Sequence, residues 1–183
     1  GLENIDSQKP YVFAANHQSQ YDIFTLMAYL PVQFKWMAKK SLFYIPILGW
    51  GIKACGTIFV DRESPKAAYV ALLKALELLK KGYSIVVFPE GTRSYDGTIG
   101  AFKSGGIILA LRAGVPIVPV TIIGTFEILP RSSKHIKPGT AIIVIDKPID
   151  VTHYTEQDKN TLANLVRERV VKNYEKYKNT RVI

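Results

Sequence analysis

Short, nearly unbroken apolar runs recur along the chain, and longer stretches with a helical spacing of apolar positions separate them. Continuous apolar runs of this length are typical of strands that are covered on both faces, because no position along them has to face water. The runs that we predict to be strands are Tyr11–Ala15, Gly56–Val60, Ser84–Phe88, Pro116–Ile122 and Ala141–Ile145, and Gln33–Ala38 is a weaker candidate.

Helical patterns fill the segments between these runs, and they carry start and stop signals. Ser64 can cap a helix that has Pro65 at its first position and stops at Gly82. Another predicted helix runs from about Lys103 to Ala113 and ends at Gly114, and the last runs from after Thr155 to about Tyr177.

Strands and helices alternate throughout, which favours an α/β fold with a mostly parallel, mixed sheet flanked by helices. A length of 183 residues suits one domain with a substantial core and is short for two. No repeat, linker or low-complexity segment divides the sequence. We therefore expect residues 1–183 to form a single domain.

The net charge of the chain indicates which partners it could bind, and the cysteine content indicates its redox compartment. A formal net charge of +9 suits an anionic partner, such as a membrane surface, an acidic carrier protein, a phosphorylated substrate or nucleic acid. Nucleic acid is supported by the charge alone, because the sequence contains no nucleic-acid-binding motif. We therefore expect no nucleic-acid partner. The single cysteine, Cys55, rules out an internal disulfide and fits a reducing compartment.

The sequence contains no run of about 18 uncharged apolar residues that would predict a transmembrane helix. The chain opens at Gly1, shortly before the first predicted strand, and we expect that an upstream membrane-anchoring segment is missing from it. The segment Ser41–Trp50 sets aromatic residues beside Lys39, Lys40 and Lys53. Such a segment can lie at a lipid interface or form an ordinary core or pocket wall.

The first candidate for chemistry is the pair His17 and Asp22, directly after the strand Tyr11–Ala15. Ser19 followed three residues later by Asp22 is typical of a helix start, which places His17 in the loop and Asp22 in the first helical turn. A carboxylate that folds back there can accept the Nδ1–H of the imidazole and leave Nε2 as a base. Taken alone, the pair could equally be a helix cap beside a loop histidine.

Cations follow several predicted strands. Arg93 lies in the segment Phe88–Ser94, Arg62 closes the segment that begins at Gly56, and Lys39 and Lys40 follow Gln33–Ala38. Because ligands bind at the carboxyl ends of parallel strands, these side chains could form one positive rim beside His17. Each of them separately could be a solvated surface charge.

Four ordered motifs then resemble the glycerolipid acyltransferase family, and most of all its bacterial 1-acyl-sn-glycerol-3-phosphate acyltransferases. The motifs are Asn16-His17 with Asp22, Gly56 with Phe59-Val60-Asp61-Arg62, Phe88-Pro89-Glu90-Gly91-Thr92-Arg93-Ser94, and Val115–Val120. The resemblance implies a glycerol-3-phosphate acyltransferase-like fold. It also implies transfer of an acyl group from a thioester to the sn-2 hydroxyl of 1-acyl-glycerol 3-phosphate (lysophosphatidic acid), giving phosphatidic acid.

The resemblance also implies roles for individual residues. His17 would be the general base and Asp22 would orient it. Val115–Val120 would line or support the acyl-chain site. The residues implied to hold the glycerol phosphate are Arg62, Glu90, Gly91, Thr92 and Arg93, with Lys39 or Lys40 as the family's lysine.

No cofactor is implied beyond the acyl donor, which is either acyl-coenzyme A or acyl carrier protein. The expected location is the cytoplasmic face of a membrane. Two other functions stay open: acylation of another lysophospholipid or of glycerol 3-phosphate, and a non-catalytic module that binds lipid phosphate. Cys55 is more readily a core residue than a nucleophile, and no metal site is expected, because His17, His135 and His153 lack paired ligand spacing.

Overall fold

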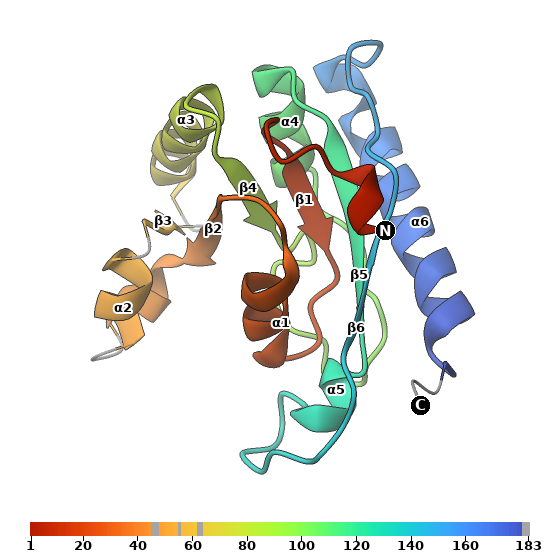
Figure 1. The fold of residues 1–183 in the computed structure, drawn as a ribbon. Coiled ribbons are helices and arrows are strands. Elements are labelled where there is room, and N and C mark those ends of the chain that lie inside the picture. The colour runs from red at the N-terminus through yellow and green to blue at the C-terminus, as the bar shows by residue number, and fades with distance from the viewer. Residues whose placement is uncertain (45–47, 55, 62–63, 181–183) are drawn as a thin grey trace.

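The computed structural model describes residues 1–44, 48–54, 56–61 and 64–180, which form a six-stranded sheet with the order β3-β2-β4-β1-β5-β6 (Figure 1). The strands are β1 (Val12–Ala15), β2 (Phe34–Lys39), β3 (Ile58–Val60), β4 (Ser84–Val87), β5 (Ile117–Ile123) and β6 (Ile142–Ile145). Strands β1 to β5 run parallel, and β6 pairs antiparallel with β5. The predicted mostly parallel, mixed sheet is therefore confirmed, and the weaker candidate Gln33–Ala38 supplies β2.

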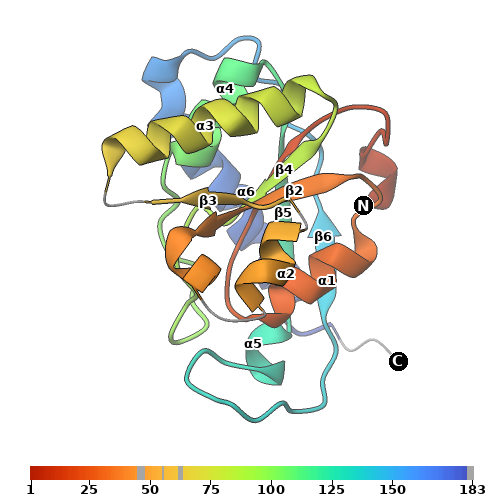
Figure 2. The ribbon, with the colours of Figure 1, turned by 90° about the vertical axis from the view of Figure 1, so that its left-hand side faces the viewer.

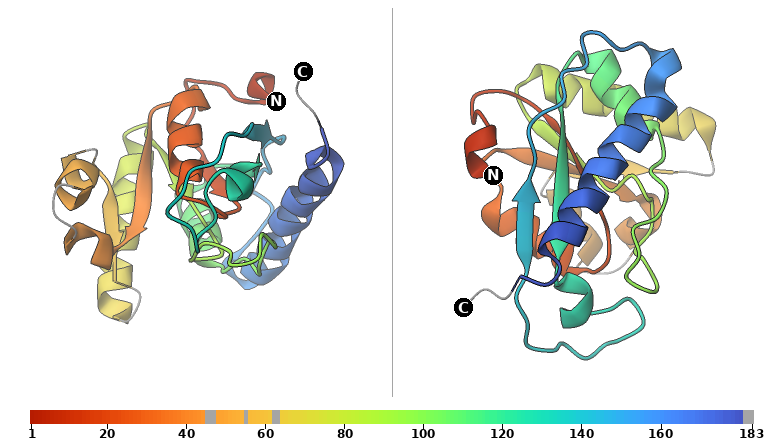
Figure 3. Two further views of the ribbon diagram at one scale, coloured as in Figure 1. Left: turned by 90° about the horizontal axis from the view of Figure 1, so that it is seen from below. Right: turned by 90° about the vertical axis from the view of Figure 1, so that its right-hand side faces the viewer.

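Helices cover both faces of this sheet. They are α1 (Tyr21–Tyr29), α2 (Leu48–Ala54), α3 (Pro65–Lys80), α4 (Gly105–Ala113), α5 (Thr125–Ile128) and α6 (Lys159–Tyr177). Figure 2 shows α3 on one side of β2 and β3, with α1 and α2 on the other side. Figure 3 shows α6 crossing the sheet beside β5, with which it makes many contacts. No helix within the described residues is long and apolar enough to cross a membrane.

The central strand β1 explains why the apolar runs are unbroken. All four of its residues are buried. Val12 and Ala14 face the core that α3, α4 and α6 cover, whereas Phe13 and Ala15 face the core beneath α1. Because successive strand residues point to opposite faces, a strand with two covered faces has to be apolar at every position.

Two of the helix signals in the sequence, Ser64 and Gly114, lie at the ends of their helices, as expected. The side chain of Ser64 accepts a hydrogen bond from the backbone N–H of Ala67 at 3.2 Å and caps α3. Gly114 adopts a left-handed conformation with φ of 63° and ends α4. The short helices α2 and α5 were not predicted, because α2 lies in a Gly-rich apolar stretch and α5 is only four residues long.

The register of the sheet brings three loops to one edge. Ala14 lies beside Val87 of β4, and Ala15 lies beside Val120 of β5. The loops that follow β1, β4 and β5 therefore leave the same end of three neighbouring strands. This end of an open parallel sheet is where ligands bind in α/β proteins.

Gly124 ends β5, and we predict that it is essential for stability. Its φ is 85°, and a Cβ atom there would overlap the backbone carbonyl oxygen of Thr140. Gly82 has the same φ of 85°, but a Cβ atom there would meet nothing within 4 Å. Gly82→Ala should therefore lower the free energy of unfolding by about 1 kcal/mol through backbone strain alone. Gly124→Ala should lower it by at least about 3 kcal/mol.

Urea unfolding of the two variants and of the wild type measures this difference. Equal losses in Gly82→Ala and Gly124→Ala would contradict the close approach of Thr140.

Candidate active site

The carboxylate of Asp22 is fully buried in the first turn of α1. Its Oδ2 accepts hydrogen bonds from Nδ1 of His17 at 2.8 Å and from the backbone N–H groups of Gln18 and Ser19 at 2.7 and 2.9 Å. Its Oδ1 accepts a hydrogen bond from the hydroxyl of Thr125 at 2.5 Å. A buried carboxylate needs such donors, because its desolvation is otherwise strongly unfavourable. Asp22 therefore folds back toward the loop that carries His17, as expected.

The imidazole of His17 is held at one edge and on one face. Because a carboxylate only accepts hydrogen bonds, the ring presents Nδ1–H to Asp22 and keeps the lone pair on Nε2. The ring stacks on Phe88 with 3.8 Å between centroids and 13° between planes. Phe88 stacks in turn on Trp36 at 5.8 Å. The His17 side chain retains 15% of its exposed area, so it is ordered by its neighbours without being enclosed.

Ser19 precedes α1, as its spacing from Asp22 predicted, but it is not the N-cap residue of this helix. The N-cap residue is Gln20, whose side chain makes no capping bond. Ser19 instead accepts a hydrogen bond from the N–H of Tyr21 at 3.1 Å and donates its hydroxyl proton to the carbonyl of Leu129 at 2.7 Å. The hydroxyl therefore connects the start of α1 to the loop that follows α5.

Glu90 lies in the loop after β4 and fixes the backbone of His17. Its Oε1 accepts the N–H of His17 at 2.8 Å, and its Oε2 accepts the N–H of Gly100 at 2.9 Å. The carbonyl of His17 accepts the N–H of Ser94 from the same loop at 2.8 Å. Burial raises the pKa of the Glu90 carboxyl above its ordinary value, although these two N–H donors act in the opposite direction. Both carboxylate oxygens thus serve to position this loop and that of His17.

Gly91, Thr92 and Arg93 follow in the same loop. Gly91 has φ of 79°, which allows the sharp turn closed by its N–H bond to the carbonyl of Phe88 at 2.9 Å. Thr92 is exposed, and Arg93 is half-buried. Burial and the charge of Arg131 lower the pKa of Arg93, while Asp22 is close enough to act in the opposite sense. Arg93 directly precedes Ser94, whose backbone N–H binds the carbonyl of His17, so Arg93 lies beside the loop that carries His17.

The structure adds several residues for which the sequence offered no role. The side-chain amide of Asn16 forms two hydrogen bonds with the backbone of Ile122, each 2.8 Å long, and ties the exit of β1 to β5. Gln18 donates from Nε2 to the carbonyl of Gly97. Thr125 binds Asp22, and Arg131 binds the loop that carries Thr92 and Arg93. Asn16 and Gln18 lie within the first motif, whereas Thr125 and Arg131 lie outside all four.

Of the remaining predicted cations, Lys39 and Lys40 are not brought to His17. Lys39 is the exposed last residue of β2, and strand alternation puts it on the same face as Met37, opposite Trp36 and the stacked ring of His17. The ammonium group of Lys40 pairs with Asp61 at 3.3 Å. Arg62 and Cys55 lie outside the described residues.

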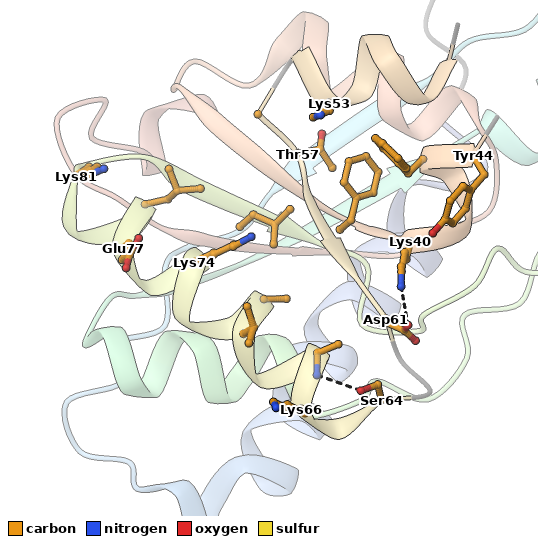
Figure 4. Close-up of a pocket in the computed structure, with 18 residues that line it drawn as sticks. Lys40, Tyr44, Lys53, Thr57, Asp61, Ser64, Lys66, Lys74, Glu77 and Lys81 are labelled. Carbon is orange, nitrogen blue, oxygen red and sulfur yellow. Dashed lines mark hydrogen bonds and ion pairs between the residues drawn. The ribbon is translucent and has the colours of Figure 1, made fainter. Parts of the chain in front are cut away.

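Lys40 lines a cavity of about 900 Å³ beside β3 and α3. Figure 4 shows Lys40, Lys53, Lys66, Lys74 and Lys81 around it. Neither His17 nor Asp22 is among the residues that line this cavity. Lys40 therefore belongs to a region distinct from the His17 loop.

The Val115–Val120 motif, expected to line or support the acyl-chain site, lies in the core. Val118 and Val120 of the Val115–Val120 motif are completely buried and belong to the core beneath α1, where they support the strand beside β1.

In the described part of the chain, no three or more His, Cys, Asp or Glu residues are grouped in a way that could hold a metal ion.

Comparisons with known proteins identify the family and the fold of the chain. The acyltransferase family model matches residues 1–123. The crystal structure of the 1-acyl-sn-glycerophosphate acyltransferase PlsC from Thermotoga maritima superposes with a TM-score of 0.85 and is 33% identical, and the match covers all of this chain and 72% of that one.

Curated relatives agree with this match. The chain is 41% identical over 172 residues to the chloroplastic 1-acyl-sn-glycerol-3-phosphate acyltransferase LPAT1 of Arabidopsis thaliana, covering 93% of this chain and 47% of the relative. It is 33% identical over 178 residues to the 1-acyl-sn-glycerol-3-phosphate acyltransferase of Borreliella burgdorferi, covering 97% and 71%. The chain spans about half the length of the first two plant relatives, at 47% and 44%.

The family match includes the loops that carry His17, Asp22 and the segment from Glu90 to Arg93, as well as β5. The solved relative shares the whole fold. The chain belongs to the acyltransferase family.

Proposed function

We propose that this chain transfers an acyl group from a thioester to the sn-2 hydroxyl of 1-acyl-glycerol 3-phosphate and so forms phosphatidic acid. The observation that carries the proposal is the 2.8 Å contact between Nδ1 of His17 and the buried carboxylate of Asp22. The names of the relatives support the choice of acceptor. The half-buried guanidinium of Arg93, near this pair, supports an acceptor that bears a phosphate.

In the proposed reaction, Nε2 of His17 removes the proton of the acceptor hydroxyl while the oxygen attacks the thioester carbonyl carbon. The tetrahedral intermediate collapses with cleavage of the carbon–sulfur bond, and the imidazolium returns the proton to the leaving thiolate. Asp22 stabilises the imidazolium and keeps the ring in the required tautomer. Because the thioester is already activated, the reaction needs no covalent intermediate with the protein.

The acyl donor in this proposal is acyl-coenzyme A or acyl carrier protein, and no other cofactor takes part. Both donors are anionic, which suits a chain with a net charge of +9. Lys39 and Arg62 stay predictions as phosphate ligands. In this proposal Glu90 positions the His17 loop and does not bind the phosphate. A carboxylate that accepts two backbone N–H groups has no donor to offer a phosphate.

We also propose that the protein works at a membrane surface, on its cytoplasmic face. Exposed apolar side chains support this, since Phe24, Met27 and Tyr29 of α1 keep 63%, 54% and 66% of their area exposed. Tyr44 and Trp50 belong to the segment Ser41–Trp50, for which a lipid interface was one of two alternatives, and each is 68% exposed. Figures 1 and 2 both show α1 and α2 on the same side of the molecule. Aromatic and apolar side chains combined with positive charge favour an anionic lipid surface.

The main rival is a non-catalytic module that binds lipid phosphate. The ordered His17 argues against it, because a binding module has no need for an imidazole held by a carboxylate, an aromatic ring and two backbone bonds. Acylation of another lysophospholipid or of glycerol 3-phosphate is the second alternative. A panel of acceptors assayed with both donors distinguishes among them.

His17→Ala should lower the rate of thiol release from an acyl thioester in the presence of 1-acyl-glycerol 3-phosphate by about 10²- to 10⁴-fold, because the general base is lost. The matched control is His135→Ala, which alters an exposed histidine and should leave the rate unchanged. Wild-type turnover by His17→Ala would refute the proposed mechanism.

Glu90→Gln should lower kcat by at least about 10-fold and leave the KM for the acceptor within about twofold. The amide can accept only one of the two N–H groups and sets its own N–H₂ against the other, so the His17 loop shifts. Glu127→Gln, on the exposed side of α5, serves as the control. A raised KM with an unchanged kcat would show instead that Glu90 contacts the acceptor.

Arg93→Gln should lower kcat/KM for 1-acyl-glycerol 3-phosphate by about 10- to 100-fold, because one charged hydrogen bond to the phosphate is lost. The rate with the neutral acceptor 1-monoacylglycerol should stay the same. Arg112→Gln, which breaks the ion pair with Glu156, is the control. An equal loss with both acceptors would indicate that Arg93 has only a structural role.

A further inference from the structure

Arg131 lies outside the sequence motifs, in the loop that follows α5, yet its guanidinium reaches the loop that carries Arg93. Its Nη1 donates hydrogen bonds to the hydroxyl of Thr92 at 2.7 Å and to the carbonyl of Arg93 at 3.0 Å. The centre of the guanidinium lies 3.9 Å from the centroid of the Tyr95 ring. These contacts hold the plane of the guanidinium in one orientation.

The loop that carries Arg131 is fastened to the His17 region as well. Ser19 donates its hydroxyl proton to the carbonyl of Leu129 at 2.7 Å and forms an isolated β-bridge with Pro130. At the other end of α5, Thr125 binds the Asp22 carboxylate. The loop that carries Arg131 is therefore anchored to the segment that carries His17 and Asp22.

The two guanidinium groups form a concentrated positive charge. Arg93 and Arg131 are both half-buried, and within the described residues neither forms an ion pair with a carboxylate. Arg131 is hydrogen-bonded to the backbone carbonyl of Arg93, and its charge lowers the pKa of Arg93. Two like charges brought together in a partly buried site are stabilised by a bound anion.

Arg131 also keeps donors for such an anion. A guanidinium has five N–H groups in a planar fork, and the two protein bonds of Arg131 come from Nη1 alone. The N–H groups on Nη2 and Nε suit the paired oxygens of a phosphate.

We infer that Arg131 is a second phosphate-binding arginine and that the Arg93–Arg131 pair selects a phosphate monoester over a phosphodiester. This inference rests on the proposed function. A monoester carries a charge of about −1.5 to −2 near neutral pH and has three terminal oxygens. A phosphodiester carries one charge and has two such oxygens, so it gains less from a second guanidinium. The pair therefore favours 1-acyl-glycerol 3-phosphate over lysophospholipids with an esterified headgroup.

Binding of soluble headgroups tests the inference without turnover. Phosphorus-31 NMR titration would compare glycerol 3-phosphate with glycerophosphoglycerol, its diester counterpart, on the wild type in the absence of an acyl donor. The monoester should bind at least about 10-fold more tightly than the diester. Arg131→Gln should weaken monoester binding by about 10- to 100-fold and alter diester binding by less than about threefold. Arg131→Lys should recover part of the loss, since it keeps the charge without the fork.

Lys134→Gln, an exposed cation in the same loop, is the matched control and should bind both headgroups as the wild type does. Urea unfolding of each variant separates lost binding from lost folding. Equal weakening of both headgroups in a folded Arg131→Gln protein, or no preference for the monoester in the wild type, would overturn the inference. Selective monoester binding that depends on Arg131, in a protein without acyl transfer, would uphold it and refute the proposed function.

Discussion

The buried carboxylate of Asp22 accepts four hydrogen bonds, and the arrangement of the site depends on it. Three donors come from the loop after β1, and the fourth is Thr125, which begins α5 after β5. A buried carboxylate is unfavourable unless each oxygen meets donors, so the loops have to converge on it. The same bonds fix the imidazole of His17 and the backbone of the two residues that follow it. The need to satisfy one buried charge thus produces the geometry that general-base chemistry requires.

Glu90 complements Asp22 from the loop after β4. It binds the backbone N–H of His17, while Asp22 binds the side chain, so the histidine is restrained at both ends by acidic groups with different tasks. The three loops begin at neighbouring strands of a parallel sheet, and each contributes different residues to the site. The loop after β1 carries His17, the loop after β4 carries Arg93, and the loop after β5 joins the other two through Thr125 and Arg131.

The sequence was sufficient for what depends on local spacing. The apolar runs predicted the strands, Ser64 and Gly114 predicted helix ends, and the spacing of His17 and Asp22 predicted their contact. It was not sufficient where distant segments meet. Thr125 is 103 residues from Asp22, and Arg131 is 39 residues from Thr92, so no local pattern connects them. Lys39 is a second case that the sequence could not settle. The face of the sheet to which its side chain points depends on how β2 pairs with its neighbouring strands.

The tautomer of the His17 imidazole is the most direct test of the central claim, that Asp22 prepares Nε2 as a base. Nitrogen-15 NMR of the three histidine side chains distinguishes a protonated from an unprotonated ring nitrogen, and the exposed His135 and His153 serve as internal references. In the neutral ring of the wild type, Nδ1 of His17 should carry the proton and Nε2 should be free, and Asp22→Asn should lose this preference. A wild-type His17 with the proton on Nε2 would contradict the account.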